Sequence, residues 1–160
     1  WNSIKQGQEL FVYTKELIRL RKKYPVLHSR MPLRGMDYLS CGYPDISFHG
    51  KDAWRPDMGA GSRSLGILYC TRYGALSAKN DDSFLYIGIN MYWEPYTFGL
   101  PQMPKDQKWV LLFTTDAPKQ ETDSGSEEEH PFNILVPPRT VVVYGTRTIQ
   151  AASKKRKGTE

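Results

Sequence analysis

The sequence has few of the side chains that carry chemistry. It contains two cysteines and three histidines in 160 residues, and His28, His49 and His130 are far apart in the chain. Neither cysteine stands beside a histidine in a nucleophile pattern, and no glycine-rich phosphate loop follows a predicted strand. Ser62 and Ser64 lack the flanking glycines that expose a nucleophilic serine. The residues therefore predict no catalytic site, no metal site and no cofactor.

Long apolar runs and a disulfide framework are also missing. No run of about eighteen apolar residues is present, and the start, WNSIKQGQEL, lacks the basic-then-apolar order of a secretory signal. We therefore expect no membrane partner. Cys41 and Cys70 show no metal-ligand spacing, and two cysteines in a chain of this length are typical of free thiols. This composition favours a reducing compartment, the cytoplasm.

The positive charge is concentrated at one end. Lys154, Lys155, Arg156 and Lys157, opposed by Glu160, supply +3 of the formal net charge of +5. The rest of the chain carries only +2, too little for a surface that follows a phosphate backbone. We expect residues 151–160 to form a disordered basic tail and predict no nucleic-acid partner. A nucleic-acid-binding module is an alternative that only this tail supports.

One amphipathic helix is predicted near the start. Leu10, Tyr13, Leu17, Leu20 and Tyr24 recur three or four residues apart, which predicts a helix over residues 5–24. The proline that follows should end it, because the ring removes a donor and disfavours helical geometry at the preceding residue. A lone helix must bury its apolar side, either on the sheet that follows or against a neighbouring domain.

The second half of the chain predicts strands separated by short turns. In residues 83–90, Leu85, Ile87 and Ile89 alternate with Phe84, Tyr86 and Gly88. This two-residue period is typical of a strand covered on both faces. Strands that follow one another without helices favour a mainly β fold, an antiparallel β-sandwich preceded by the single helix. The acidic segment between Asp116 and Pro131 is predicted to be a mobile surface loop. The strands are expected at residues 65–70, 83–90, 96–100, 109–115, 133–136 and 140–144.

The stretch from Asp45 to Leu65, DISFHGKDAWRPDMGAGSRSL, is the most individual part of the sequence. It combines a histidine, two aromatic residues, three aspartates and three glycines, and we expect a long loop over residues 45–64. Asp45, Asp52 and Asp57 could supply a pair of carboxylates at glycosidase separation. However, aspartate among glycine and proline is far more typical of turns and caps.

Several of these segments resemble one enzyme family. Residues 17–27, LIRLRKKYPVL, are similar to the last barrel helix of the alpha-amylase superfamily. DISFHG, Pro56-Asp57 and SRSL then follow in the order of the D-I-x-W-H-G, P-D-W and S-R-S-L motifs of isoamylase-type starch and glycogen debranching enzymes. The later segments 82–90, 94–100 and 136–140 resemble that family as well, so the resemblance covers nearly all of residues 10–144.

The resemblance implies a part of such an enzyme without its active site. In the family, the nucleophilic aspartate, the acid glutamate and the second aspartate lie before the last barrel helix, so none can be assigned to this chain. The implied organisation is a last barrel helix at 1–27, a C-terminal β-sandwich domain at 28–150 and the tail. Phe48 and Met58 replace tryptophans that are usual in the family, which argues against sugar stacking by this loop.

The resulting hypothesis is a non-catalytic C-terminal domain of a glycogen or starch debranching enzyme. The parent would hydrolyse alpha-1,6-glucosidic branch linkages, and the partner of this domain would be the catalytic barrel of the same polypeptide. The alternative is a carbohydrate-binding module that contacts alpha-glucan through surface aromatics. The candidate contacts to sugar or barrel are His49, Trp54, Asp57, Tyr92, Trp93 and Tyr96.

Overall fold

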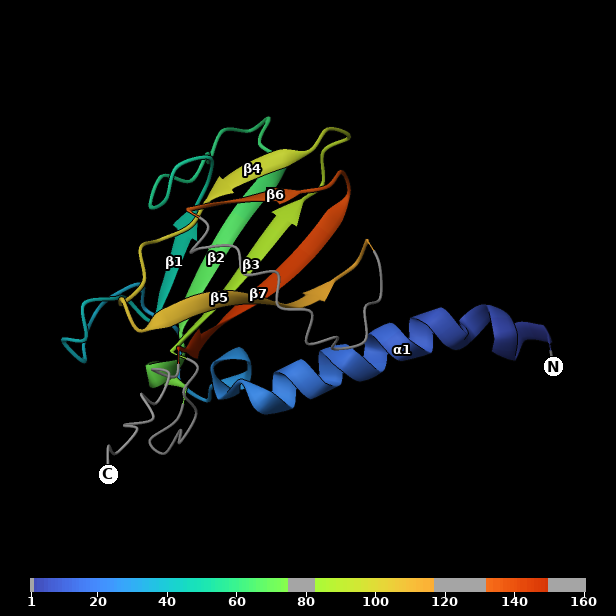
Figure 1. The fold of residues 1–160 in the computed structure, drawn as a ribbon, viewed down its shortest axis with the longest axis horizontal. Helices are drawn as coiled ribbons and strands as arrows, with labels where there is room; N and C mark the ends of the chain where they lie inside the picture. The colour runs from blue at the N-terminus through green and yellow to red at the C-terminus, as the bar shows by residue number, and fades with distance from the viewer. Residues whose placement is uncertain (1, 75–82, 117–131, 150–160) are drawn as a thin grey trace, which may run out of the picture.

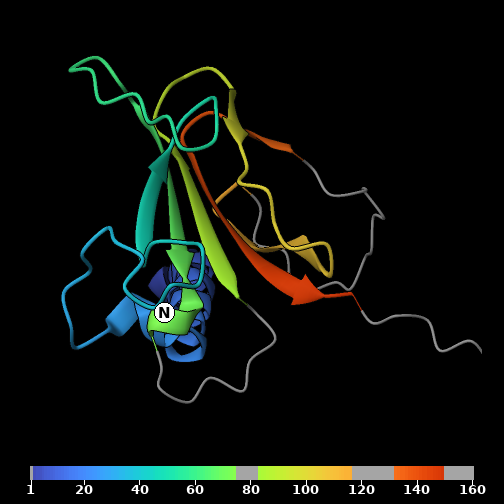
Figure 2. The same ribbon diagram turned by 90° about the vertical axis from the view of Figure 1, so that its left-hand side faces the viewer.

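Two antiparallel sheets form a sandwich in the computed structural model, which describes residues 2–74, 83–116 and 132–149, with the backbone alone for 2–6 and 9. The larger sheet has the order β1-β2-β3-β7-β5, and the smaller one pairs β4 with β6. The smaller sheet lies across one face of the larger one (Figure 1 and Figure 2). The prediction of a mainly β sandwich with one N-terminal helix is confirmed. The strands are β1 (Ile46–His49), β2 (Ser64–Cys70), β3 (Phe84–Asn90), β4 (Tyr96–Gly99), β5 (Gln107–Thr114), β6 (Asn133–Val136) and β7 (Thr140–Thr148).

The six predicted strands are present, but the sequence did not predict β1. Its residues Ile46–His49 lie inside the stretch expected to be a loop, and they pair antiparallel with β2. The fully buried residue of this strand is the polar His49. The sequence of the strand therefore lacks the alternation of apolar residues that would predict it. The irregular part of this stretch is therefore residues 50–63, which we call the 50–63 segment. Strand β7 is also longer than predicted, because Thr146 continues the inward-facing set after Gly145.

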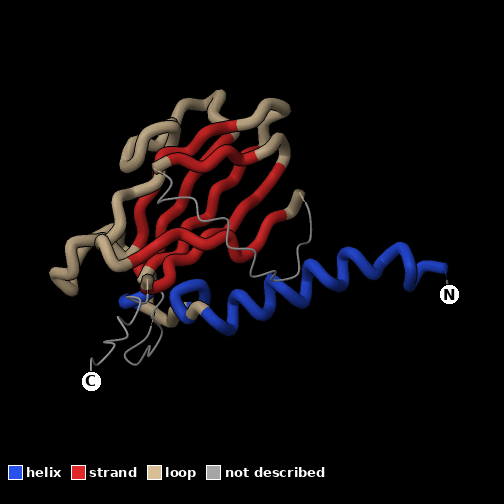
Figure 3. Tube along the Cα trace, viewed as in Figure 1, coloured by secondary structure: helices blue, strands red, loops and turns tan. Residues whose placement is uncertain are grey.

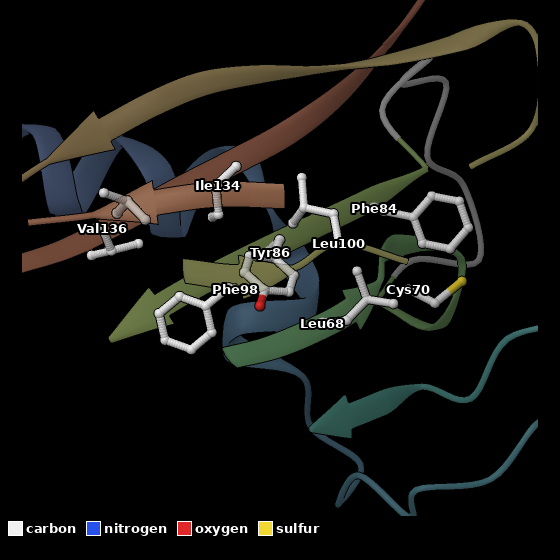
Figure 4. Close-up of a cluster of buried hydrophobic side chains, with 9 residues drawn as sticks. Leu68, Cys70, Phe84, Tyr86, Phe98, Leu100, Ile134 and Val136 are labelled. Atoms are coloured by element: carbon white, nitrogen blue, oxygen red, sulfur yellow. The ribbon is translucent and has the colours of Figure 1, made fainter. Parts of the chain in front are cut away.

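The core between the sheets is built mainly from β2, β3, β4 and β6. Tyr86 lies in its centre and is fully buried (Figure 4). A glycine on the neighbouring strand makes room for this ring: a Cβ on Gly66 would collide with the Tyr86 hydroxyl. The other buried members are Leu68, Cys70, Phe84, Phe98, Leu100, Ile134, Val136 and Val142.

A second core covers the opposite face of the larger sheet, where the helix packs. Helix α1 (Asn2–Lys23) ends before Pro25, as predicted, and a short 3-10 helix (Pro25–His28) follows. Tyr24 is buried with Leu85, Phe113 and Val143. The Tyr13 hydroxyl donates to the Thr115 carbonyl oxygen at 2.9 Å. Both faces of β3 are therefore covered, as its alternating sequence predicts.

Helix α1 has a second apolar side that the sandwich does not cover. The helix runs past the edge of the sheets (Figure 3). Leu10, Phe11, Leu17 and Ile18 are between 50% and 71% exposed, whereas Leu20 of the same helix packs against the second core. The sequence left two partners open for this helix, and the structure shows that the sheet takes only one flank.

Some sequence predictions lie outside the described residues. These are the basic tail 151–160, the acidic segment 117–131 and, among the short turns predicted between strands, the one at 79–82. In the part of the chain that the structure describes, no helix combines the length and apolar character needed to cross a membrane.

Candidate functional site

The connection before β1 is held by a buried carboxylate. We call residues 29–45 the 29–45 segment. Asp45 is fully buried, and its two oxygens accept backbone N–H groups from Arg34 at 2.7 Å and Gly35 at 2.8 Å. They also accept the N–H groups of Met36 at 3.3 Å and Ile46 at 2.8 Å. A carboxylate engaged in this way caps a turn, so Asp45 is not a free acid or base.

A second aspartate fixes the tip of the 29–45 segment. Asp37 accepts the Tyr73 hydroxyl at 2.6 Å and the N–H groups of Cys41 at 2.9 Å and Gly42 at 2.8 Å. The Tyr73 hydrogen bond, followed by the backbone donors, lowers the pKa of Asp37 to about 2. Asp37 therefore stays ionised at any ordinary pH and keeps the segment attached to the 3-10 helix at Thr71–Tyr73.

His49 holds the start of the 50–63 segment. Its Nδ1 accepts the backbone N–H of Trp54 at 2.8 Å, which assigns the ring proton to Nε2, and Nε2 then donates to Ser47 Oγ at 2.9 Å. Burial lowers the pKa of His49 to about 4. Protonation of Nδ1 would break the hydrogen bond to Trp54, so the ring must stay neutral to hold this backbone.

Trp54 is displayed on a strained backbone next to this histidine. It has a φ of +67°, a conformation that is uncommon for a bulky residue. Its ring lies 4.8 Å from the ring of His49 and 6.3 Å from that of Tyr43, and its side chain is 46% exposed. Strain of this kind persists only where the surrounding structure determines it, here through the hydrogen bond to His49.

A second aromatic pair lies in the turn between β3 and β4. Tyr92 and Trp93 stack at 4.1 Å, Trp93 is 60% exposed, and the Arg63 guanidinium lies 6.0 Å from the Trp93 ring. Buried Asn90 stabilises this turn. Its Oδ1 accepts the Tyr92 N–H at 3.0 Å, and its Nδ2 donates to the Glu94 carbonyl oxygen at 2.8 Å.

The predicted contact residues do not form one cluster. His49 and Trp54 touch, Tyr92 and Trp93 touch, and Tyr96 packs against the core between the sheets. Asp57 is exposed and makes a local turn by accepting the Gly59 N–H at 2.9 Å. The 50–63 segment and the turn between β3 and β4, which carry these aromatic residues, share the end of the sandwich farther from α1 (Figure 1 and Figure 2).

Sequence reasoning missed two partners in these groups. It did not place Tyr43 against Trp54, and it noted Arg63 only as part of a motif. Tyr43 carries no local pattern, because it follows a glycine in a connection without periodicity. The proximity of Arg63 to Trp93 depends on a tertiary hydrogen bond, from the Met91 N–H to the Arg63 carbonyl oxygen at 2.8 Å.

The arrangement displays aromatic rings beside titratable groups that are hydrogen-bonded to the backbone. Among the described residues, no group of three or more His, Cys, Asp or Glu side chains converges to hold a metal ion. The buried carboxylate of Asp45 and the buried ring of His49 are engaged with backbone N–H groups, whereas Trp54 and Trp93 expose aromatic faces. Exposed, immobilised rings present flat apolar area at little entropic cost.

Comparison with known proteins gives a likeness in fold. Neither the search of protein families nor the search of curated proteins finds a match. Among solved structures, the chain is similar to Bacillus licheniformis trehalose-6-phosphate hydrolase (TreA), with 15% sequence identity and a TM-score of 0.44. The match covers 84% of this chain but only 18% of that chain. The chain therefore corresponds to less than a fifth of the length of that protein.

Proposed function

We propose that the chain is a non-catalytic C-terminal domain that packs on the catalytic barrel of a debranching enzyme of the alpha-amylase superfamily. The proposed parent hydrolyses alpha-1,6-glucosidic linkages in glycogen or starch and works in the cytoplasm. The motif series from residue 17 to residue 140 supports the family. Two of the three candidate aspartates support a non-catalytic role, because Asp45 is enclosed by N–H groups and Asp57 makes a turn.

The uncovered side of α1 is the observation that carries this proposal. One flank of the helix packs Tyr13 and Leu20 against the second core, while Leu10, Phe11, Leu17 and Ile18 remain exposed. An exposed apolar side of a helix that is otherwise packed on a sheet favours an interaction surface. The sequence similarity of residues 17–27 to a last barrel helix identifies the expected occupant as the rest of that barrel.

The test uses the complete gene product that contains this chain. We expect a barrel with three catalytic carboxylates before Trp1, and hydrolysis of branched maltooligosaccharides at alpha-1,6 linkages. The double variant Leu17→Asp/Ile18→Asp should lower the unfolding temperature of the barrel and its activity together. The reason is that two charges would be placed in a buried contact, at a cost of several kcal/mol.

Leu135→Asp is the matched control for this experiment. Leu135 is 67% exposed on β6, away from α1, so an aspartate there should leave both properties unchanged. A gene product that starts at this chain, or a double variant that behaves like the control, would contradict the proposal.

A second candidate function is favoured by the aromatic end of the sandwich. Trp54 and Trp93 are exposed while their rings are held by His49 and Tyr92. Immobilised aromatic faces suit the apolar faces of glucosyl rings. In a titration with branched maltooligosaccharides, tryptophan fluorescence should change, and both Trp54→Ala and Trp93→Ala should weaken the change. Phe132→Ala, at another exposed aromatic, is the control. The absence of any change at millimolar ligand would count against sugar binding.

A further inference from the structure

The two cysteines of the chain meet in space. Cys41 lies in the 29–45 segment and Cys70 ends β2, yet their sulfur atoms are 3.9 Å apart. They are not bonded to each other. A disulfide requires about 2.05 Å between the sulfurs, so an approach of about 2 Å would close the pair.

The two thiols differ in their access to solvent. Cys70 is fully buried beside Phe84 and Leu68 (Figure 4), and burial raises the pKa of its thiol to about 12. Cys41 is half-buried, and its thiol donates to the Tyr43 carbonyl oxygen at 3.4 Å. An oxidant from solvent therefore meets Cys41 first, and Cys70 lies behind it as a resolving thiol.

The backbones of both cysteines are positioned by aspartates. The Cys41 N–H donates to Asp37 Oδ1 at 2.9 Å, and the Cys70 N–H donates to the Asp45 carbonyl oxygen at 3.1 Å. Because Asp37 and Asp45 fix the 29–45 segment, the two sulfurs are held near each other by the native fold rather than by chance encounter.

We propose that Cys41 and Cys70 form an oxidisable dithiol, which closes to a disulfide when the folded chain meets a small-molecule disulfide such as oxidised glutathione. The site depends on the geometry of this chain and holds whether or not the chain belongs to a debranching enzyme.

The chemistry proceeds by two exchange steps. The Cys41 thiolate attacks one sulfur of the small disulfide, forms a mixed disulfide and releases one small thiol. Cys70 then gives up its proton, its sulfur attacks Cys41 Sγ, and the second small thiol leaves. The cysteine pair loses two electrons and two protons, and one small disulfide gains them as two thiols.

The Cys41–Cys70 disulfide would link the 29–45 segment covalently to the edge of the core. The bond would link positions 29 apart in the chain, which restricts the unfolded state. We expect the unfolding temperature to rise by about 5–10 °C for a loop of this size. Reduction should return it to the starting value.

The test is a mass measurement on the purified, reduced chain after incubation with oxidised glutathione. The wild type should lose two hydrogens and leave no thiol for alkylation after denaturation. Cys70→Ala should instead carry one glutathione on Cys41, because the resolving thiol is gone. Cys41→Ser should remain unmodified while folded and react at Cys70 only in denaturant.

The mass of the oxidised wild-type chain tests the proposal by itself, so the test does not depend on whether the variants fold. A wild-type chain that keeps glutathione on Cys41 with Cys70 still free, that dimerises through Cys41, or that retains both thiols would overturn the proposal.

Discussion

The 29–45 and 50–63 segments are both irregular connections, one on each side of β1, but they are held in different ways. The 29–45 segment is organised by side chains: buried Asp45 accepts four backbone N–H groups, and Asp37 accepts two more and the Tyr73 hydroxyl. The 50–63 segment is held mainly at its base, by His49 and by the Gly99 N–H, which donates to the Gly50 carbonyl oxygen at 3.2 Å.

The difference shows that aspartate has different structural roles in the connections before and after β1. Asp45 supports a whole connection, whereas Asp57 makes a single turn on an exposed one. The more individual sequence belongs to the 50–63 segment, and the greater number of side-chain hydrogen bonds belongs to the other. In this chain, the unusual sequence therefore belongs to a segment that exposes side chains such as Trp54, and not to the segment with more stabilising hydrogen bonds.

The largest expected effect is that of removing the Asp45 carboxylate. Asp45→Ala would leave the N–H groups of Arg34, Gly35 and Ile46 without their acceptor. We expect the free energy of unfolding to fall by about 3–4 kcal/mol, measured by urea denaturation. Asp45→Asn should lose less, since one oxygen still accepts. Equal stability of Asp45→Ala and wild type would mean that this segment is not held by its side chains.

The next effect concerns the backbone contact at the base of the 50–63 segment. A Cβ on Gly99 would lie 2.6 Å from the Ala53 backbone nitrogen and 2.8 Å from the Lys51 carbonyl oxygen. Gly99→Ala must push this base off β4, and we expect a loss of about 2–3 kcal/mol by thermal or urea unfolding. Gly61→Ala, where a Cβ meets nothing within 4 Å, is the control and should change little. Similar losses for both variants would refute a close packing at the base.

The third effect is a pH dependence that comes from His49. Its pKa is about 4 in the folded chain and about 6.5 in the unfolded one, so the unfolded state binds the proton more readily. The stabilisation is complete above pH 6.5 and is lost as the pH falls towards 4. Between pH 7 and pH 5 we expect His49 to account for a loss of about 1–2 kcal/mol in the free energy of unfolding.

Two variants separate this effect from general acid sensitivity. His49→Asn removes the titrating ring while its side-chain oxygen can still accept the Trp54 N–H, so the difference between pH 7 and pH 5 should shrink. His28→Asn changes an exposed histidine and should keep the wild-type difference. An unchanged pH difference in His49→Asn would assign the acid sensitivity to other groups.

The sandwich could be predicted because most of its strands have a recognisable pattern within their own few residues. The alternation in residues 84–90 identifies β3 directly, and prolines stand before and after the segments that form β4 and β6. Strand β1 was missed because its inward position is His49, whose burial depends on hydrogen bonds to Ser47 and Trp54. The sequence predicted which residues are candidate contacts. It did not predict that they separate into two groups, because this depends on the turn stabilised by Asn90, which has no local sequence pattern.

The smallest expected effect is at Asp57, the counterpart of Asp45 in the 50–63 segment. Asp57 is exposed, and within the described parts of the chain its side chain accepts only the Gly59 N–H at 2.9 Å, a donor that water can satisfy after the substitution. Asp57→Ala should therefore change the free energy of unfolding by less than about 0.5 kcal/mol in the same urea experiment. The ratio between this loss and that of Asp45→Ala measures the contrast between the two segments. A loss at Asp57 as large as that at Asp45 would show that the exposed segment is held by its side chains too, and that its aromatic residues owe their positions to more than the contacts at its base.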